Sequence, residues 1–356
     1  MNIGIPTEIK PQEGRVALTP AAASELVRHG HQVSLQSGAG IKAGFSDQSY
    51  QQYGIQIVKD AKALYDLSEL IIKVKEPIAG DLELLTQDHT VFSYLHLAAL
   101  PDLTQQLLDL GLTAIAFETV QEADGRLPLL APMSDIAGRL SVQIGTHLLH
   151  QPMGGKGILL GGVPASQRGK VVILGAGMAG GNAALMAAKQ GANVVVFDNN
   201  RDKMEKMRQL GDNVTALYPY SESIYEQVLD ADLIIGAVLV TGDKAPHLVS
   251  EAMVKEMQQG SVIVDISVDQ GGCVETTKPT SFDSPTFSQH GVTHFCVTNM
   301  PGSVPRTSTE ALSASLLPWA LKLANNPKNL CPELQKGVNI KAGEIVYPVL
   351  KDLFQS

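Results

Sequence analysis

The chain of 356 residues has only three cysteines, few aromatic residues and no apolar run long enough to cross a bilayer. Cys273, Cys296 and Cys331 lack the spacing of a metal or redox site, and so small and odd a set is typical of a reducing cytoplasm. The longest apolar runs, 91–100 and 233–240, are far shorter than the roughly 20 residues of a transmembrane helix. The first 15 residues carry charges throughout, unlike a signal peptide. We therefore expect a cytoplasmic protein outside the membrane, without a metal site.

Positive charge is scarce as well. The chain has 27 Lys and Arg residues against 36 Asp and Glu residues, which gives a formal net charge of −9 and a pI near 5.5. This balance argues against a nucleic acid or an anionic membrane as a partner. Hydrophobic residues make up 44% and charged residues 18%, as in ordinary soluble α/β proteins, and the length allows two domains with a substantial core.

Glycine, by contrast, is concentrated where it is most informative. Residues 170–174 (KVVIL) have the composition of a buried parallel strand and are followed by the turn Gly175-Ala176-Gly177-Met178-Ala179-Gly180. In this pattern the first glycine permits a tight turn and the second lets the backbone approach a pyrophosphate. The third lets the following helix, expected over 179–190, pack closely on the strand.

A second strand, expected over 193–197, leads to Asp198, which is 198 − 180 = 18 residues past the last glycine. A carboxylate at that place accepts hydrogen bonds from both ribose hydroxyls and disfavours a 2′-phosphate, so the segment predicts an NAD site. The alternative is a tight turn followed by an ordinary surface aspartate.

Further strands are expected in both halves of the chain. The N-terminal candidates are 3–5, 32–35, 70–74, 91–95 and 113–117, and the C-terminal ones are 213–217, 232–238, 261–267 and 293–298. Helical patterns alternate with them, at 21–29 and 103–110 for example, and Thr19-Pro20 is a typical helix start. The fold class is therefore α/β. We expect a doubly wound Rossmann sheet for NAD over 129–306 and a second, Rossmann-like substrate domain over 1–128 plus 307–356, with a cleft between them.

Ligands of open parallel sheets bind outside the carboxyl ends of the strands, so the polar residues that follow each strand are candidates. They are Lys75, His96, Glu118 and Asp269, together with Arg15 in the first loop. Each also has a structural interpretation. Lys75 would lie at a solvated strand end, on the same side as Lys73. His96 and Glu118 would be structural. Asp269 would form a turn, and Arg15 would lie on the surface. Ser134 is either the cap of a helix that runs to about residue 149 or a cofactor contact.

Taken together, these groups suit a 2-oxo acid/2-amino acid couple beside NAD. Arg15 would hold a carboxylate and Lys75 would polarise a carbonyl oxygen. His96, with an ordinary pKa near neutrality, would move the proton that accompanies the hydride.

Seven motifs resemble the alanine dehydrogenase family. They are GIPTEIK at 4–10, EGRVALTP at 13–20, KVKEP at 73–77, YLHLA at 94–98, LLAPMS at 129–134, DQGGCVE at 269–275 and NMP at 299–301. The resemblance implies interconversion of L-alanine and pyruvate with NAD and ammonia, and a homohexamer. It implies that Arg15 and Lys75 bind substrate and that His96 and Asp269 are the acid–base residues.

The cofactor contacts that the resemblance implies are Ser134, Gly175, Gly177, Met178, Ala179, Gly180, Asp198, Lys203, Val238, Leu239, Ile266, Ser267, Val268, Asp269, Lys278, Thr298, Asn299 and Met300. Two positions depart from the family pattern. Pro219 replaces a serine in the adenosine-side loop, and Lys278 stands where some members have arginine. Two other functions stay open: a transhydrogenase alpha subunit, whose family lacks a counterpart of His96, and a catalytically silent NAD-binding protein.

Overall fold

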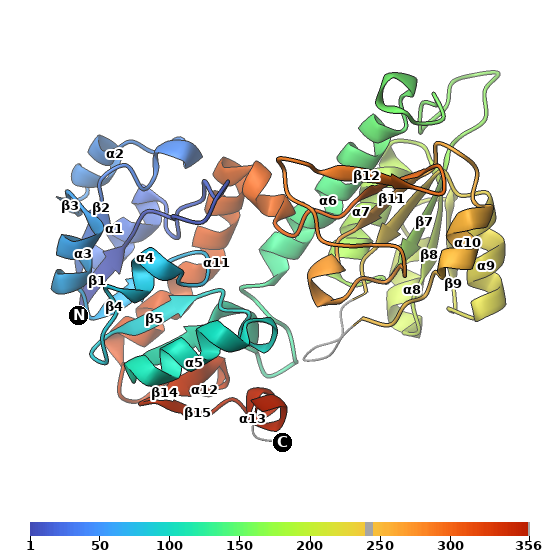
Figure 1. The fold of residues 1–356 in the computed structure, drawn as a ribbon. Coiled ribbons are helices and arrows are strands. Elements are labelled where there is room, and N and C mark those ends of the chain that lie inside the picture. The colour runs from blue at the N-terminus through green and yellow to red at the C-terminus, as the bar shows by residue number, and fades with distance from the viewer. Residues whose placement is uncertain (239–244, 355–356) are drawn as a thin grey trace. The chain divides into compact units, whose positions relative to one another are not determined.

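The computed structural model describes residues 1–238 and 245–354. The chain divides into two compact units (Figure 1). Unit 1 comprises Met1–Met133 and Pro301–Ser356, and unit 2 comprises Ser134–Met300. The assignment of substrate to the first and NAD to the second remains a prediction. In the described ranges, no helix has the length and apolarity to cross a membrane.

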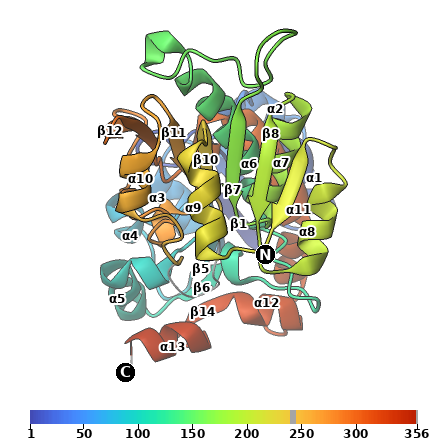
Figure 2. The same ribbon diagram turned by 90° about the vertical axis from the view of Figure 1, so that its right-hand side faces the viewer.

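Unit 2 contains a seven-stranded sheet of order β12-β13-β11-β10-β7-β8-β9 (Figure 2). Its parallel strands are β7 (Lys170–Leu174), β8 (Asn193–Phe197), β9 (Val214–Leu217), β10 (Leu233–Gly236), β11 (Val262–Asp265) and β13 (Val292–Phe295). All six were expected. The sequence missed β12 (Thr286–Gln289), an antiparallel edge strand whose half-exposed residues form no apolar run.

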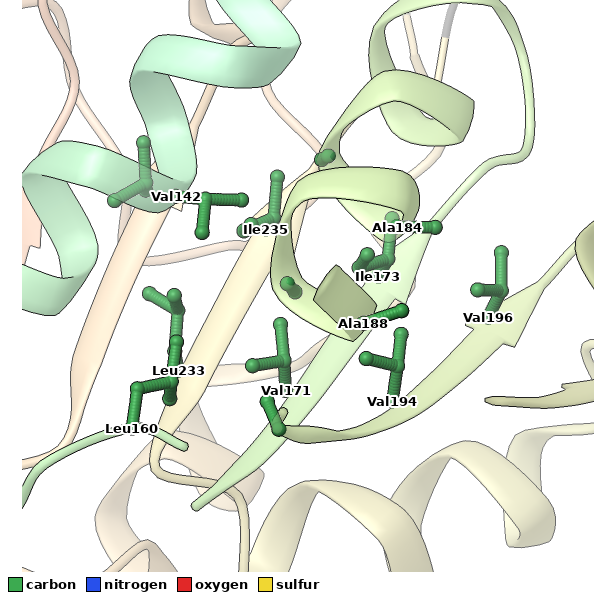
Figure 3. Close-up of a cluster of buried hydrophobic side chains, with 14 of the residues drawn as sticks. Val142, Leu160, Val171, Ile173, Ala184, Ala188, Val194, Val196, Leu233 and Ile235 are labelled. Carbon is green, nitrogen blue, oxygen red and sulfur yellow. The ribbon is translucent and has the colours of Figure 1, made fainter. Parts of the chain in front are cut away.

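Helices cover both faces of this sheet. Helices α6 (Ala131–Leu148), α7 (Met178–Lys189) and α8 (Arg201–Arg208) contribute Val142, Ala184 and Met207 to one apolar cluster, part of which Figure 3 shows. Helices α9 (Ser221–Leu229) and α10 (Glu251–Glu256) contribute Ile224 and Val254 to a second cluster, formed with the alternate side chains of the same strands. The sheet is therefore doubly wound, as predicted.

Unit 1 contains an eight-stranded sheet of order β15-β14-β6-β5-β4-β1-β2-β3. Its strands are β1 (Asn2–Ile5), β2 (Gln32–Gln36), β3 (Gln56–Val58), β4 (Leu70–Ile72), β5 (Thr90–Ser93), β6 (Thr113–Ala116), β14 (Val338–Lys341) and β15 (Glu344–Ile345). The first six are parallel and follow the same order as the parallel strands of unit 2, so the prediction of a second Rossmann-like domain is confirmed. The sequence missed β3, β14 and β15, which are short.

The helices of unit 1 are α1 (Pro20–Arg28), α2 (Asp47–Gln51), α3 (Ala61–Leu67), α4 (Ala79–Leu82), α5 (Pro101–Leu110), α11 (Pro305–Asn325), α12 (Pro332–Gly337) and α13 (Pro348–Phe354). Helix α1 begins as the Thr19-Pro20 pair predicted, because the Thr19 hydroxyl accepts a hydrogen bond from the Ala22 N–H at 3.3 Å.

Several strands end two or three residues before the predicted limit. The reason is visible at Val74 and Leu95, which extend the apolar runs and are buried, but lie in the loops that follow β4 and β5. Burial of apolar residues therefore continues past the last residue of the strand, so the apolar run in the sequence is longer than the strand itself.

Candidate dinucleotide and substrate sites

The three glycines of the turn after β7 meet three different steric demands. Gly175 has φ +96°, and a Cβ there would lie 2.7 Å from the Ala237 carbonyl oxygen. A Cβ at Gly180 would lie 1.8 Å from the Gly175 carbonyl oxygen, so α7 can approach β7 only without one. At Gly177, by contrast, no heavy atom lies within 4 Å of the Cβ position. The turn thus leaves room for a phosphate group at the N-terminus of α7, where backbone N–H groups favour an anion.

Asp198 fastens this turn to the end of β8. One carboxylate oxygen accepts a hydrogen bond from the Ala176 N–H and the other accepts one from the Asn200 N–H, both at 2.8 Å. The ammonium of Lys203 lies 3.6 Å from the carboxylate. The side chain is buried, so it is not the ordinary surface aspartate of the alternative interpretation. It lies beside the glycine turn, where a ribose-binding carboxylate belongs.

Other predicted cofactor residues follow neighbouring strands of unit 2. Val238 follows β10, and its carbonyl oxygen accepts a hydrogen bond from the Ser267 hydroxyl at 2.7 Å. Ile266, Ser267 and Val268 follow β11, while Thr298, Asn299 and Met300 follow β13. Leu239 lies outside the described residues. The ammonium of Lys278 lies 4.6 Å from the centre of the Phe287 ring on β12.

Ser134 is not a helix cap. Helix α6 begins at Ala131, four residues before residue 135, where it would begin if Ser134 were the N-cap. The preceding Pro132 suits the first turn, because proline lacks the N–H that has no intrahelical partner there. Of the two alternatives for Ser134, the helix cap is therefore wrong, and the cofactor contact stays a prediction.

Asp269 lies in a short 3₁₀ turn, Val268–Gln270, and is exposed. The loop that carries it is organised by a residue that the sequence analysis missed, Asp265. Its buried carboxylate accepts hydrogen bonds from the Ser267 N–H at 3.0 Å and from the Cys273 N–H and Thr277 hydroxyl at 2.9 Å. Burial raises the pKa of Asp265, and these three donors act against that rise. The sequence offers one signal for Asp265, because this charged residue directly follows the apolar run Val262-Ile263-Val264.

In unit 1, Arg15 is buried rather than on the surface. Its Nε and Nη2 donate to the two carboxylate oxygens of Glu13 at 2.7 and 2.6 Å, and Nη1 lies 3.2 Å from the Met133 sulfur. Burial opposes the charge on Arg15, yet the Glu13 carboxylate outweighs it and raises the pKa of the guanidinium. The loop after β1 therefore presents a permanent cation.

The two lysines after β4 have separate environments, contrary to the expectation of one solvated side. Strand β4 ends at Ile72, so strict alternation does not continue to Lys75. Lys73 is buried and its ammonium lies 2.8 Å from Asp81 and 3.5 Å from Glu8. Lys75 is also buried, and its ammonium lies 3.4 Å from Glu76.

Lys75 is the chemically unusual member of the pair. Burial lowers its pKa, and the positive charges of Lys10 and Arg15 lower it further, against the attraction of Glu76 and Glu13. The charge of Arg15 therefore acts on Lys75, as expected if the two residues bind one substrate. Glu8, which the sequence analysis also missed, accepts a hydrogen bond from the Val74 N–H at 2.5 Å and so holds the backbone next to Lys75.

His96 follows β5 and has φ +51°, a left-handed conformation that few residues adopt. Glu118 accepts a hydrogen bond from its backbone N–H at 2.6 Å and from that of Leu95 at 3.1 Å. The imidazole stacks on the Tyr94 ring at 6.0 Å between centroids and 10° between planes. Tyr94 in turn helps to raise the pKa of the Arg15 guanidinium. Lys75 and His96 thus follow the carboxyl ends of β4 and β5, and Arg15 lies in the long loop after β1.

These features define the chain as a two-unit α/β protein with a dinucleotide-binding Rossmann fold. The described residues contain no group of three or more His, Cys, Asp or Glu side chains that could hold a metal ion. The descriptions "Alanine dehydrogenase/PNT, N-terminal domain" and "Alanine dehydrogenase/PNT, C-terminal domain" match residues 4–137 and 141–348.

Individual relatives agree with the family descriptions. The alanine dehydrogenase of Bacillus subtilis is 48% identical over 99% of this chain and 95% of its own length, and that of Mycobacterium tuberculosis strain H37Rv is 46% identical over 97% and 95%. A solved L-alanine dehydrogenase superposes with a TM-score of 0.95 and 50% identity, covering 100% of this chain and 99% of the other. The chain therefore belongs to the alanine dehydrogenase/PNT family, and the predicted resemblance is confirmed.

A transhydrogenase from Sinorhizobium meliloti superposes with a TM-score of 0.83, 98% coverage of this chain and 99% coverage of its own. Its identity is only 23%, so this likeness concerns the fold alone.

Proposed function

We propose that this chain is an NAD-dependent alanine dehydrogenase, which catalyses the reversible reaction of L-alanine, NAD⁺ and water to give pyruvate, ammonium, NADH and a proton. The observation that carries the proposal is the pair of buried cations, Arg15 and Lys75, in a chain related over its full length to alanine dehydrogenases. A buried cation attracts an anionic ligand such as a 2-oxo acid more strongly than a solvated cation does, because the surrounding dielectric is lower.

The residues around the β7 turn fit NAD. The open space at Gly177 and the N-terminus of α7 would receive the pyrophosphate, and Asp198 would accept hydrogen bonds from the adenosine ribose. When bound, NAD⁺ accepts a hydride from the substrate Cα. A phosphate on the ribose would meet the Asp198 carboxylate, so NAD is preferred over NADP, although Lys203 softens the repulsion.

The residues of unit 1 hold the substrate and move its proton. Arg15 binds the carboxylate of alanine or pyruvate, and Lys75 binds the carbonyl oxygen, on which negative charge develops as ammonia adds. His96 exchanges the proton between substrate and solvent. Asp269 of unit 2 takes the second acid–base role, which family membership supports. The other residues with proposed NAD contacts are Ser134, Lys203, Lys278 and those that follow β10, β11 and β13.

We further propose that the enzyme works in the cytoplasm as a homohexamer. Family resemblance supports the assembly, and the sparse, unpaired cysteines support the compartment.

A direct assay tests the function. Purified protein is mixed with L-alanine and either NAD⁺ or NADP⁺, and NADH or NADPH formation is followed by absorbance; the reverse reaction uses pyruvate, ammonium and NADH. Turnover with NAD⁺ and a lower kcat/KM with NADP⁺ are expected. NADH binding without turnover in either direction would identify a silent binding protein, and hydride exchange between two nucleotides without alanine would identify a transhydrogenase.

A further inference from the structure

Lys73 is a buried lysine to which the proposed reaction gives no role. Its side chain is 1% exposed, and the two carboxylates beside it, Glu8 and Asp81, are 2% and 4% exposed. Burial opposes the charge on Lys73, but the two carboxylates outweigh burial and raise its pKa. Buried ion pairs of this kind add little net stability, because desolvation offsets the attraction, so Lys73 is a candidate for another role.

The Glu8 carboxylate holds the backbone at Lys75. One oxygen accepts a hydrogen bond from the Val74 N–H at 2.5 Å, and the other accepts one from the Lys75 N–H at 3.4 Å. This second oxygen also lies 3.5 Å from the Lys73 ammonium. Protonation would turn one carboxyl oxygen into an O–H donor, so the two contacts require the ionised form. Glu8 thus holds Lys75 best while it carries its charge.

The Lys73 ammonium holds the backbone on the other side of Lys75. It donates to the Glu76 carbonyl oxygen at 3.4 Å and to the Asp81 carboxylate of α4 at 2.8 Å. Asp81 in turn accepts a hydrogen bond from the Tyr65 hydroxyl of α3 at 2.8 Å. The network therefore ties the segment after β4 to α3 and α4, and its Glu8 end lies against the backbone of the proposed substrate-binding lysine.

We propose that the buried pair of Lys73 and Glu8 positions Lys75 for catalysis, with Lys73 supplying the countercharge that Glu8 needs. The inference rests on the proposed function and extends it to two positioning residues that act through Lys75. Glu8 fixes the Lys75 N–H and Lys73 fixes the carbonyl of the next residue, so the backbone is held on both sides. A displacement of about 1 Å at a catalytic group can lower the rate roughly 100-fold.

The surroundings of Glu8 make its charge depend on Lys73. Burial raises the pKa of Glu8, and the Lys73 ammonium is the largest influence that acts against this rise. The titratable or charged groups that act on Glu8 or are influenced by it are Lys73, Glu13, Arg15, Tyr65 and Asp81. Without Lys73 the pKa of Glu8 rises further, so the carboxyl becomes protonated at a higher pH and its hold on the backbone weakens there.

Lys73→Met tests this dependence, because it removes the cation and keeps an unbranched apolar side chain. We expect kcat for the reductive amination of pyruvate to fall roughly 10- to 100-fold, with the dissociation constant of NADH unchanged. Relative to wild type, the fall should be largest at low pH and lessen as the pH rises, because Glu8 then ionises. In Lys73→Met/Glu8→Gln position 8 does not titrate, so this added pH dependence should disappear.

Two controls separate positioning from stability. Tyr65→Phe removes a donor to Asp81 at the far end of the network and leaves Lys73 beside Glu8, so it should lower the melting temperature and retain kcat. Lys62→Met removes an exposed lysine that pairs with Asp66 at 2.6 Å and should change neither quantity. Melting temperatures check that each variant is folded.

If Lys73→Met does not fold, Glu8→Gln takes its place, because Lys73 then keeps its contact with Asp81. Glu8→Gln should lower kcat, since an amide N–H₂ replaces one of the two acceptors. The inference is overturned if the folded Lys73→Met or Glu8→Gln variant turns over as wild type does. It is also overturned if the fall in Lys73→Met is the same at every pH, or if Tyr65→Phe loses as much kcat. Absence of L-alanine turnover in wild type would instead overturn the proposed function.

Discussion

Glu13 holds Arg15 by the edge of the guanidinium formed by Nε and Nη2, and both side chains are buried. Glu13 also accepts a hydrogen bond from the Arg15 backbone N–H at 3.0 Å, so a residue two positions away sets both the backbone and the side-chain orientation. If Arg15 binds a substrate carboxylate as proposed, we expect contact at another part of the guanidinium than the Nε–Nη2 edge that Glu13 holds.

Replacement of Glu13 tests this arrangement. In Glu13→Gln an amide N–H₂ faces the guanidinium donors, so we expect the KM for pyruvate to rise about tenfold and the free energy of unfolding to fall by up to about 3–5 kcal/mol. Urea unfolding and initial rates measure the two effects. Glu25→Gln is the matched control, because Glu25 pairs with Arg28 at 2.6 Å on the surface. An unchanged KM in Glu13→Gln would show that Glu13 does not position Arg15 for substrate.

Arg15 and Lys75 are expected to affect different kinetic constants. Arg15→Lys loses a fork contact present in ground and transition states alike and should chiefly raise the KM for pyruvate. Lys75→Met should chiefly lower kcat, because charge develops on the carbonyl oxygen only as ammonia adds. Each effect is expected to be about ten- to a hundredfold. The opposite division in steady-state kinetics would mean that the two roles are exchanged.

Lys75 should also give pyruvate binding a pH dependence. Its pKa is lowered, so the ammonium that attracts the anion is lost on raising the pH before the range in which an ordinary lysine deprotonates. Glu76 counteracts that lowering, and Glu76→Gln should move the loss of affinity to still lower pH. The dissociation constant of pyruvate for the enzyme–NADH complex is measured by NADH fluorescence as a function of pH, in wild type and in Glu76→Gln. A loss of affinity that moves to higher pH in Glu76→Gln would contradict this account.

His96 is tested best by asparagine. Alanine at this left-handed position adds backbone strain of about 1–2 kcal/mol, whereas asparagine tolerates the conformation. We expect His96→Asn to lower kcat by about 10²–10⁴-fold with little change in melting temperature or NADH affinity. If most of the turnover survives, His96 has only a structural role.

Asp265 and Asp269 form a matched pair in one loop. Asp269→Asn removes the charge of the proposed acid–base residue, so turnover in both directions should fall, with a smaller loss of stability than in Asp265→Asn because Asp269 is exposed and Asp265 is buried. Asp265→Asn turns an amide N–H₂ toward three buried donors and should cost about 1–3 kcal/mol of stability. Thermal unfolding beside kinetics in both directions distinguishes the two. A loss of stability in Asp269→Asn as large as that in Asp265→Asn, or impairment of NADH binding alone, would make it a structural or cofactor residue.

The dinucleotide-binding unit could be predicted from one short segment of the sequence. The glycines at 175, 177 and 180, the two strands and Asp198 lie within 29 residues, and each requirement is local: a positive φ, a close approach of backbone, a polar residue where an apolar strand ends. Six of seven strands in unit 2 were expected for the same reason. Edge strands such as β12 and β15 were not predicted, because partial burial removes the apolar periodicity on which strand prediction depends.

Which side chains contact one another could not be predicted from local sequence and depends on the folded chain. The sequence places Lys73 and Lys75 symmetrically about Val74, yet the first is neutralised by Glu8 and Asp81 and the second has a lowered pKa beside Glu76. Glu8 lies 66 residues from the backbone that it holds, and Glu118 lies 22 residues from His96. The length of β4 depends on hydrogen bonds to β1 and β5, and no property of the segment 70–77 specifies those neighbours. The environment of each lysine is therefore set by residues distant in sequence, because burial and charge pairing are properties of the folded neighbourhood.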